Sequence, residues 1–332
     1  MKGKYTVSLW LAGGLLLLAL LSMLTGRSGF MTPGDLTGAL QGDSRAAELT
    51  RLILVELRLP RTVLACLVGA ALGLSGAVLQ GLTRNPLADP GLLGVSAGAA
   101  LGAVIALYTG IGMLFALAVP MLGLLGALAA ATLTLSLGSG GGTLVLILAG
   151  AAVSGLMLAG TALVLNMAPN PYAAYEITHW MLGSLADRGW DQVWLTAPFI
   201  LVGAALLLGT GRALDALSLG EQQAASLGVD LSRLRRRVLV GTALAIGAAT
   251  AVSGTIGFIG LVAPHLVRPL TGHQPARVLW PSAMCGALLL LLADVLTRLL
   301  PLDRELNLGV LTGLVGTPFF IALVLRLKRV AP

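Results

Sequence analysis

The pattern Gly73-Leu74-Ser75-Gly76 could carry out catalysis, because it could present a serine nucleophile. A serine attacks a peptide bond only when a general base takes its proton, and His265, which follows Pro264, is a candidate for that base. The two residues together would make an intramembrane serine protease. His265 could equally be a neutral side chain bonded to a backbone carbonyl that Pro264 leaves free. A pattern of only four residues in a Gly- and Ser-rich helix is readily matched by chance. Proteolysis is therefore kept as an alternative and is not the main prediction.

Two pairs of charged residues have spacings suited to binding a partner or each other. Arg58 and Arg61 are three residues apart at the entrance to an apolar segment. They could bind lipid headgroups or an acidic protein partner. Asp294 and Arg298 are four residues apart, which is the spacing of an ion pair within one helix.

The sequence has no motif that would bind a metal or a nucleotide. Its Cys and His residues form no cluster with metal-ligand spacing, and Cys66 and Cys285 lie in apolar stretches, as buried small hydrophobes do. The phosphate-binding pattern G-x-x-x-x-G-K-[ST] does not occur. We therefore expect no metal or cofactor on this chain and, outside the protease alternative, no catalytic residue. If its work uses ATP, the nucleotide and Mg²⁺ must bind another polypeptide.

The composition indicates a protein of the lipid bilayer. Hydrophobic residues make up 57% of the 332 positions, 44 more are glycine, and charged residues make up only 11%. A soluble fold could not hide so much apolar surface, and disordered, collagenous, coiled-coil or disulfide-rich chains need other compositions. The net charge of +7 would suggest nucleic acid as a partner of a soluble protein. Here the basic residues lie between apolar segments, so we expect an all-α membrane protein without a nucleic-acid partner.

About ten segments are apolar enough to cross a bilayer as helices, which takes about 20 residues each. They cover residues 6–25, 62–82, 91–109, 113–137, 143–167, 192–211, 238–254, 256–270, 278–300 and 308–327. The seventh and eighth are weakly separated, because residues 252–260 are Gly-rich but apolar. The first follows Lys2 and Lys4, as in a signal peptide, but no cleavage site follows and we expect it to be retained. Residues 1–332 then form a single transmembrane domain.

The loops predict the orientation in the membrane, because short cytoplasmic loops are enriched in Lys and Arg. With ten spans and the N-terminus inside, the inner side carries 13 basic and four acidic residues, and the outer side carries eight basic and ten acidic residues. Both termini are therefore expected in the cytoplasm. Nearly every charge lies at the end of a span, which argues against a secondary transporter, since ion coupling needs ionisable residues in mid-span.

The longest predicted cytoplasmic segment covers residues 212–237. Leucines precede Gly220 and small residues follow it, which predicts two short helices with a bend at Gly220. Gly228 would end the second of them, and Asp230 or Ser232 would cap the next helix. Such a pair could lie on the lipid interface, or it could form a docking platform for a cytoplasmic protein.

Four long motifs resemble, in order, the FecCD-type permease subunits of ABC importers for iron-siderophores, haem and vitamin B12. They are residues 58–98 (RLPRTVLACLVGAALGLSGAVLQGLTRNPLADPGLLGVSAG), 219–228 (LGEQQAASLG), 257–265 (GFIGLVAPH) and 305–320 (ELNLGVLTGLVGTPFF). The first motif looks much like the vitamin B12 permease. The resemblance covers nearly the whole chain and implies the type II ABC importer architecture with ten helices. It also implies a multi-pass homodimer in the bacterial inner membrane that docks two ATPase subunits inside and a periplasmic binding protein outside.

The resemblance also assigns residues by motif position. Arg58, Arg61 and Arg298 would bind glutamates of the binding protein. Coupling helices in about 213–235 would sit in a cleft of the ATPase. Their contact residues would be Leu217, Leu219, Gly220, Glu221, Ala224, Leu227 and Gly228. The inner gate would include Asn85, Leu87 and Thr143, although the loop 138–142 (GSGGG) departs from the charged loop common in the family.

The cargo implied by the resemblance is a metal chelate that is moved without chemical change. Iron(III)-siderophore is the first expectation, because it is the commonest cargo of such permeases. Cobalamin and haem are the alternatives. The chain is then a transport subunit and not an enzyme, and alternating access driven by the partner ATPase is the expected mechanism.

Overall fold

The computed structural model describes residues 3–26, 29–31, 34, 45–115, 117–300 and 305–330. The elements that carry the bundle are α1 (Gly3–Leu24), α3 (Arg45–Leu52), η1 (Ile53–Arg58), α4 (Leu59–Thr83), α5 (Val95–Thr109), α7 (Ala118–Gly138), α8 (Thr143–Asn166), α10 (Trp190–Leu208), α13 (Leu231–Ser253), α14 (Ile259–Val267), α15 (Pro275–Leu299) and α16 (Leu308–Val330). Shorter elements connect them: β1 (Thr25–Gly26), β2 (Gly29–Phe30), η2 (Pro90–Leu93), α6 (Ile111–Leu114), α9 (Pro171–Met181), α11 (Gly211–Leu217), α12 (Glu221–Ser226) and η3 (Arg268–Thr271). The expected all-α fold is confirmed.

Seven of the described helices are long and apolar enough to cross a membrane. They include α1, α7, α8, α10, α13, α15 and the continuous helix that ends with α4. Helix α5 and the apolar part of α16 are shorter apolar helices, and α14 is a helix of nine residues. With these three, the count agrees with the expected number of about ten.

The weakly marked break between the seventh and eighth spans is real. Helix α13 ends at Ser253, and α14 begins at Ile259. Between them Gly254 has φ +71° and Phe258 has φ +67°. Positive φ is sterically unfavourable for a residue with a side chain, so the turn between the two helices holds the backbone of Phe258 in a strained conformation.

The second span is longer than its apolar run suggests. Helix α3, the π-helical segment η1 and α4 follow one another without a break from Arg45 to Thr83. The polar residues between the first two apolar runs, 26–61, predict an outer loop with short helices, and α3 lies within it. Residues 27–28, 32–33 and 35–44 of that expected loop lie outside the described residues.

Glycines four residues apart, such as Gly69 and Gly73, let the central helices approach closely. A Cβ at Gly69 or Gly73 of α4 would collide with the backbone of α15 at Gly286 or Ser282. A Cβ at Gly98 would collide in the same way with Gly126 of α7. Such contacts pack backbones tightly where lipid supplies no hydrophobic driving force between helices.

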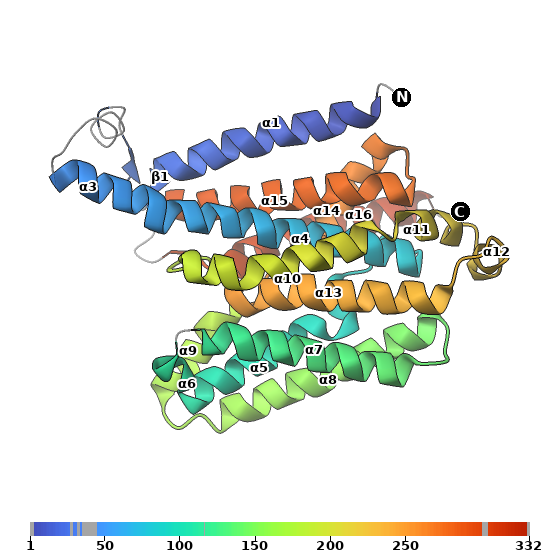
Figure 1. Ribbon diagram of the computed structural model, residues 1–332, viewed down its shortest axis with the longest axis horizontal. Helices are drawn as coiled ribbons and strands as arrows, with labels where there is room; N and C mark the ends of the chain where they lie inside the picture. The colour runs from blue at the N-terminus through green and yellow to red at the C-terminus, as the bar shows by residue number, and fades with distance from the viewer. Residues whose placement is uncertain are drawn as a thin grey trace.

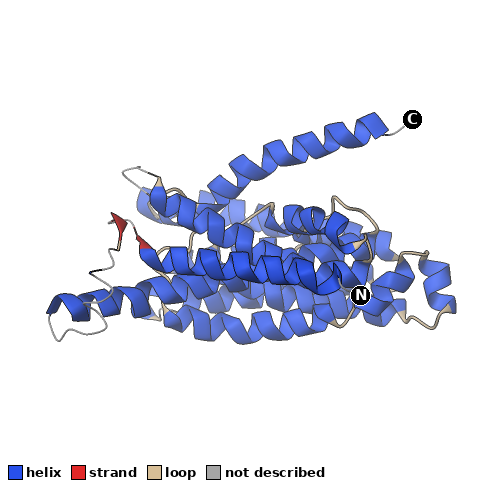
Figure 2. Ribbon diagram, turned by 90° about the horizontal axis from the view of Figure 1, so that it is seen from above, coloured by secondary structure: helices blue, strands red, loops and turns tan. Residues whose placement is uncertain are grey.

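The bundle has two distinct ends. At one end lie α3, the small β1–β2 hairpin, α6 and α9, and at the other lie α11 and α12 (Figure 1). We call these the α3 end and the α12 end. Both chain termini lie at the α12 end (Figure 1). Helix α16 runs away from the rest of the bundle toward the C-terminus (Figure 2).

Candidate functional site

A buried charged cluster at the α3 end is built around Asp294 of α15, which is fully buried. Arg61 of α4 reaches Asp294 Oδ1 with Nε and Nη2, both at 2.9 Å. Arg61 also pairs with Glu305, which begins the segment leading to α16. The Arg61 side chain is only 13% exposed. One guanidinium therefore joins three parts of the chain that are far apart in sequence.

Arg298 completes the cluster from the same helix as Asp294. Its Nη2 lies 2.6 Å from Asp294 Oδ2 and 2.6 Å from Ser22 Oγ. Its Nη1 donates to the carbonyls of Ser22, at 3.0 Å, and Thr25, at 3.2 Å. The last carbonyls of a helix lack partners within the helix, so Arg298 satisfies the end of α1.

Arg58 makes a similar contact from η1. Its Nη1 donates to the Met23 carbonyl at 2.8 Å, and the residue is 7% exposed. The three arginines singled out in the sequence are thus brought together, and each binds groups of its own chain. The i,i+4 pair of Asp294 and Arg298 is confirmed. Ser22 and Glu305 were missed, although Ser22 is a polar residue within the first apolar run.

The segment at the α12 end has the predicted form of two short helices with a bend. Gly220 has φ +117° between α11 and α12, and Gly228, after α12, has φ +83°. Only glycine adopts such angles without strain. Asp230 caps α13, since its Oδ1 accepts a hydrogen bond from Arg233 N at 2.9 Å. The choice between Asp230 and Ser232 as the cap is therefore settled in favour of Asp230.

Some side chains of the two short helices and of the residues that follow each of them are buried against the bundle, and others are exposed. Leu217 and Ala224 are buried, whereas Leu219 and Leu227 are 64% and 65% exposed. Asp215 fastens α11 to the start of α15, where its carboxylate accepts from Ala276 N at 2.8 Å and Gln274 Nε2 at 2.5 Å. Two large leucines thus project outward from a hairpin whose base is held firmly.

The residues expected at the gate fall into two separate groups. Asn85 Oδ1 accepts from Leu87 N at 2.9 Å in the turn after α4, where Arg84 has φ +52°. Thr143 begins α8 and instead bonds Glu221 of α12, with 2.6 Å between Oγ1 and Oε1. Arg235 of α13 also contacts both Glu221 and Thr143. Arg235 was missed, because nothing in the sequence distinguishes it from the neighbouring arginines.

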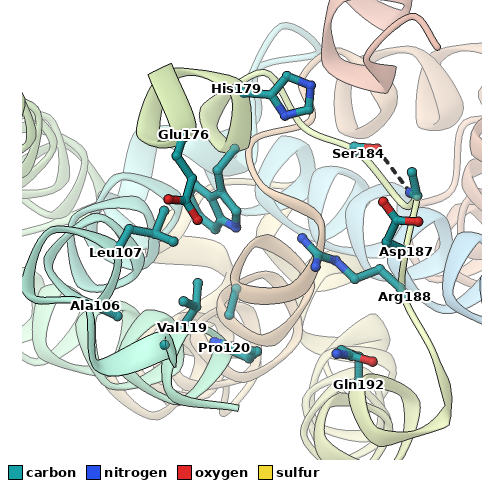
Figure 3. A pocket seen from close by; sticks show the side chains of 15 residues that line it. Ala106, Leu107, Val119, Pro120, Glu176, His179, Ser184, Asp187, Arg188 and Gln192 are labelled. Atoms are coloured by element: carbon teal, nitrogen blue, oxygen red, sulfur yellow. Dashed lines mark hydrogen bonds between the residues drawn. The ribbon is translucent and has the colours of Figure 1, made fainter. Parts of the chain in front are cut away.

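A cavity of about 410 Å³ lies at the α3 end between α9 and the ends of α5, α7, α10 and α13. Arg188 extends into it, with Glu176 on the opposite side (Figure 3). Arg188 Nε donates to the Val252 carbonyl at 2.8 Å. Burial lowers the pKa of Arg188, and the charge of Asp187 opposes that shift. Two carboxylates, Glu176 and Asp187, outnumber the one guanidinium of Arg188 on the lining of this cavity. Among the described residues no group of three or more His, Cys, Asp or Glu could hold a metal ion.

The arrangement around Ser75 does not provide a nucleophile and its base. Ser75 is fully buried in α4, and within the described structure its hydroxyl has no hydrogen-bond partner. His265 packs edge-on against Phe319, with 5.7 Å between the ring centres. An activated serine requires a hydrogen bond to its base, so the geometry does not support the protease alternative.

The structure is thus a polytopic helical bundle with a charged cluster at one end and a helical hairpin with exposed leucines at the other, as expected of a membrane transport subunit. The comparisons with known proteins agree. The family model described as the FecCD transport family matches residues 14–326. The chain belongs to this family and is a permease of an ABC importer for metal chelates.

Two relatives and one solved structure show which proteins the chain is similar to. The chain is 43% identical over 282 residues to the hemin transport system permease protein HmuU of Yersinia pestis, covering 83% of this chain and 84% of HmuU. It is 39% identical over 327 residues to the vitamin B12 import system permease protein BtuC of Salmonella paratyphi A, covering 95% and 93%. A solved metal-chelate type ABC transporter in an inward-facing conformation matches with TM-score 0.83 and 30% identity, covering 97% of this chain and 99% of the other.

Proposed function

We propose that this chain imports an iron(III)-siderophore complex across the bacterial inner membrane by alternating access, as one half of a homodimeric permease. The single observation that carries the import function is the match of the FecCD family to residues 14–326, nearly the whole chain. The α3 end faces the periplasm in this proposal, and the α12 end, with both termini, faces the cytoplasm. Lipid surrounds the bundle.

The second copy of the chain covers surface that this copy leaves open. Helix α16 diverges from the bundle (Figure 2) and exposes Leu314, Val315, Ile321 and Leu325. Apolar side chains of a membrane helix are covered either by lipid or by another helix. A dimer axis beside α16 would enclose a pathway between two copies.

In this proposal ATP and Mg²⁺ bind to two partner ATPase subunits, and this chain binds no cofactor of its own. The hairpin α11–α12 offers Leu219 and Leu227 to a cleft on each ATPase, with Gly220 at the bend. Leu217, Ala224 and Gly228 set the shape of the hairpin, and Glu221 ties it to the bundle. When ATP closes the ATPase dimer, movement of this hairpin would open or close the gate near Asn85, Leu87 and Thr143.

A periplasmic binding protein would deliver the cargo at the α3 end and supply most of its selectivity. Arg58, Arg61 and Arg298 would attract acidic side chains on that protein. Guanidinium groups suit this role because they bind carboxylates with two parallel hydrogen bonds.

The cargo is tested by uptake in a strain deleted for this chain, with labelled ferric siderophores, haem and cobalamin measured in parallel. Loss of siderophore uptake, restored by the intact gene, is the expected result. Haem and cobalamin are second candidates, because HmuU and BtuC, named for those cargoes, are 43% and 39% identical to this chain. Loss of one of them alone would replace the siderophore assignment. Normal uptake of all three, with no ATPase co-purifying with the chain, would contradict the import function.

A further inference from the structure

Arg235 differs from the arginines around it at the start of α13. Arg233 and Arg236 are exposed, and Arg237 binds a carbonyl of α10. The Arg235 side chain is only 17% exposed and reaches away from α13 toward two other elements. Its position is therefore set by those contacts and not by solvation.

The contacts of Arg235 form a closed ring with Glu221 and Thr143. Arg235 Nη2 lies 3.1 Å from Glu221 Oε2, and Arg235 Nε donates to Thr143 Oγ1 at 3.4 Å. Thr143 Oγ1 lies 2.6 Å from Glu221 Oε1 and closes the ring. Arg235 Nη1 adds a bond to the Gly141 carbonyl at 3.4 Å. Three elements, α12, α13 and the start of α8, meet at one group of charges.

Glu221 is well placed to hold α12 against the bundle. It is the first residue of α12, and Ala224, three residues later, is fully buried on the same face. Residues three apart lie side by side on a helix. The other residues of α12 are exposed. α12 thus contacts the bundle through a small face made of the apolar Ala224 and the carboxylate of Glu221.

Thr143 is well placed to pass a movement of α12 to helix α8. It is the first residue of α8, after a four-residue connection in which Gly140 has φ +78°. Three of its four residues are glycine, whose backbone freedom would let the start of α8 shift with what it is bonded to. A pull on Thr143 acts directly on the end of a 24-residue helix.

We propose that Arg235 is a positioning residue that links α12 to the start of α8 through Glu221 and Thr143, so that the two move together. This link rests on the proposed function, in which α12 receives the motion of the ATPase and Thr143 belongs to the gate. It adds to that function a specific route from the ATPase contact to the gate. Coupling through a chain of contacts can be tested by pairs of mutations of its members.

The ionisation of Glu221 favours the link at neutral pH. The hydrogen bond from Thr143 and the charge of Arg235 hold the pKa of Glu221 below its usual value. The carboxylate is therefore charged throughout the physiological range, and the ion pair is present there.

The link is tested with the permease reconstituted in liposomes with its ATPase and binding protein, where ATP hydrolysis and chelate uptake are measured together. Arg235→Gln should leave ATP hydrolysis within about twofold and lower the chelate imported per ATP by about fivefold or more. Glu221→Gln should lower the chelate imported per ATP as well, and, because Glu221 is also expected at the ATPase contact, its ATP hydrolysis is measured alongside. Arg236→Gln, an exposed neighbour, is the matched control and should leave the ratio unchanged. The swap Glu221→Arg with Arg235→Glu should recover most of the ratio, whereas each single swap should not.

A second measurement follows the motion itself. Spin labels at the exposed positions Ala225 on α12 and Leu144 on α8 should stay at a constant separation when ATP binds to the wild-type complex. In Arg235→Gln the separation should change, because α12 then moves without α8. Gel filtration of each variant checks that the permease is still folded and assembled.

The outcomes separate the link from the function on which it rests. If the wild-type complex imports chelate and Arg235→Gln keeps the same import per ATP and the same label separation, the link is wrong and the import function stands. If the wild-type complex neither binds an ATPase nor imports any of the three chelates, the function itself is wrong.

Discussion

Arg61 and Asp294 are 233 residues apart in the chain, yet two nitrogen atoms of the arginine lie 2.9 Å from one carboxylate oxygen. Asp294 is fully buried, and its other oxygen binds Arg298. Removing the carboxylate would leave two guanidinium groups close together with little access to water. Breaking a buried pair from one side costs about 3–5 kcal/mol.

Asp294→Ala should therefore lower the thermal unfolding midpoint of the purified permease strongly, and Asp294→Asn should lower it less, because the amide oxygen still accepts one hydrogen bond. Glu48→Ala, at an exposed position on α3, is the control and should change stability by no more than about 0.5 kcal/mol. Equal midpoints for Asp294→Ala and Glu48→Ala would show that the cluster does not stabilise the fold.

If the arginine cluster also docks an acidic protein, reversing its charge should weaken that interaction. Arg58→Glu with Arg61→Glu should lower the affinity for the binding protein by at least about tenfold at physiological salt, measured on immobilised permease. Because Arg61 also binds Asp294, gel filtration must first show that the double variant is still assembled. Unchanged affinity in an assembled variant would remove the docking assignment.

Glu305 provides a test of docking that leaves the arginines intact. It is one of two carboxylates that bind Arg61, and its side chain is 18% exposed, whereas that of Asp294 is fully buried. Glu305→Gln should free Arg61 for an incoming carboxylate and raise the affinity for the binding protein about fivefold. Glu48→Gln is the control. A lower affinity in Glu305→Gln would show that Glu305 helps to orient Arg61 for docking.

Two serines that are both fully buried should respond oppositely to removal of the hydroxyl. Ser22 Oγ binds Arg298 at 2.6 Å and Thr62 at 2.6 Å, so Ser22→Ala leaves both partners short of a bond and should cost about 1–3 kcal/mol. The Ser75 hydroxyl has no partner within the described structure, so Ser75→Ala should leave stability equal or higher. Chelate uptake should survive Ser75→Ala. Loss of a proteolytic activity in Ser75→Ala would instead revive the protease alternative.

The spans could be predicted from sequence because apolar runs of about 20 residues have few alternatives to a membrane helix. Local signals were equally informative, as shown by the bend at Gly220 and the cap at Asp230. The polar residues 26–61 predict a loop with short helices, and α3 is such a helix. Its continuation into the second span was not predictable, because a helix that continues a span beyond its apolar run has no hydropathy signal.

The candidate site was predictable only in part. Arg61 and Glu221 were assigned roles through motifs, and those roles stay predictions; the residues that they contact within the chain were not predicted. Glu305 is 244 residues from Arg61, and Arg235 is 92 residues from Thr143. Contacts over such separations depend on how helices pack, and one sequence does not contain that information. The sequence alone could not distinguish Arg235 from its neighbouring arginines, because only the structure shows that its side chain reaches Glu221 and Thr143.

The close approach of α4 and α14 predicts a position where even a methyl group is too large. A Cβ at Gly76 would overlap the Gly260 carbonyl, and backbone on both sides leaves nothing flexible to move. Gly76→Ala should therefore abolish assembly or lower the unfolding midpoint sharply, as overpacking of a dense interior does. Gly13→Ala in α1 is the matched control, since open space surrounds it and alanine favours helix. Equal expression and stability of the two variants would contradict the packing of α4 on α14.

Asp89 predicts a pH dependence that can be assigned to one carboxyl. Its Oδ1 accepts a hydrogen bond from Gly91 N at 2.8 Å and so caps η2. Burial nevertheless raises the pKa of Asp89, so the folded protein holds the proton more tightly than the unfolded chain does. The stability that this carboxyl contributes is therefore present below its unfolded pKa of about 3.9 and is lost as the pH rises through the higher folded value.

An asparagine at position 89 keeps the cap but has no proton to lose. Asp89→Asn should therefore be more stable than the wild type at pH 7, and the difference should shrink as the pH falls toward 4. Asp89→Ala loses the cap and should cost about 1 kcal/mol relative to Asp89→Asn. Thermal unfolding midpoints of the three proteins at four values between pH 4 and pH 8 provide the measurement. A difference between Asp89→Asn and wild type that grows as the pH falls would mean that the charged carboxylate is stabilised, and the sign assigned to its burial would be wrong.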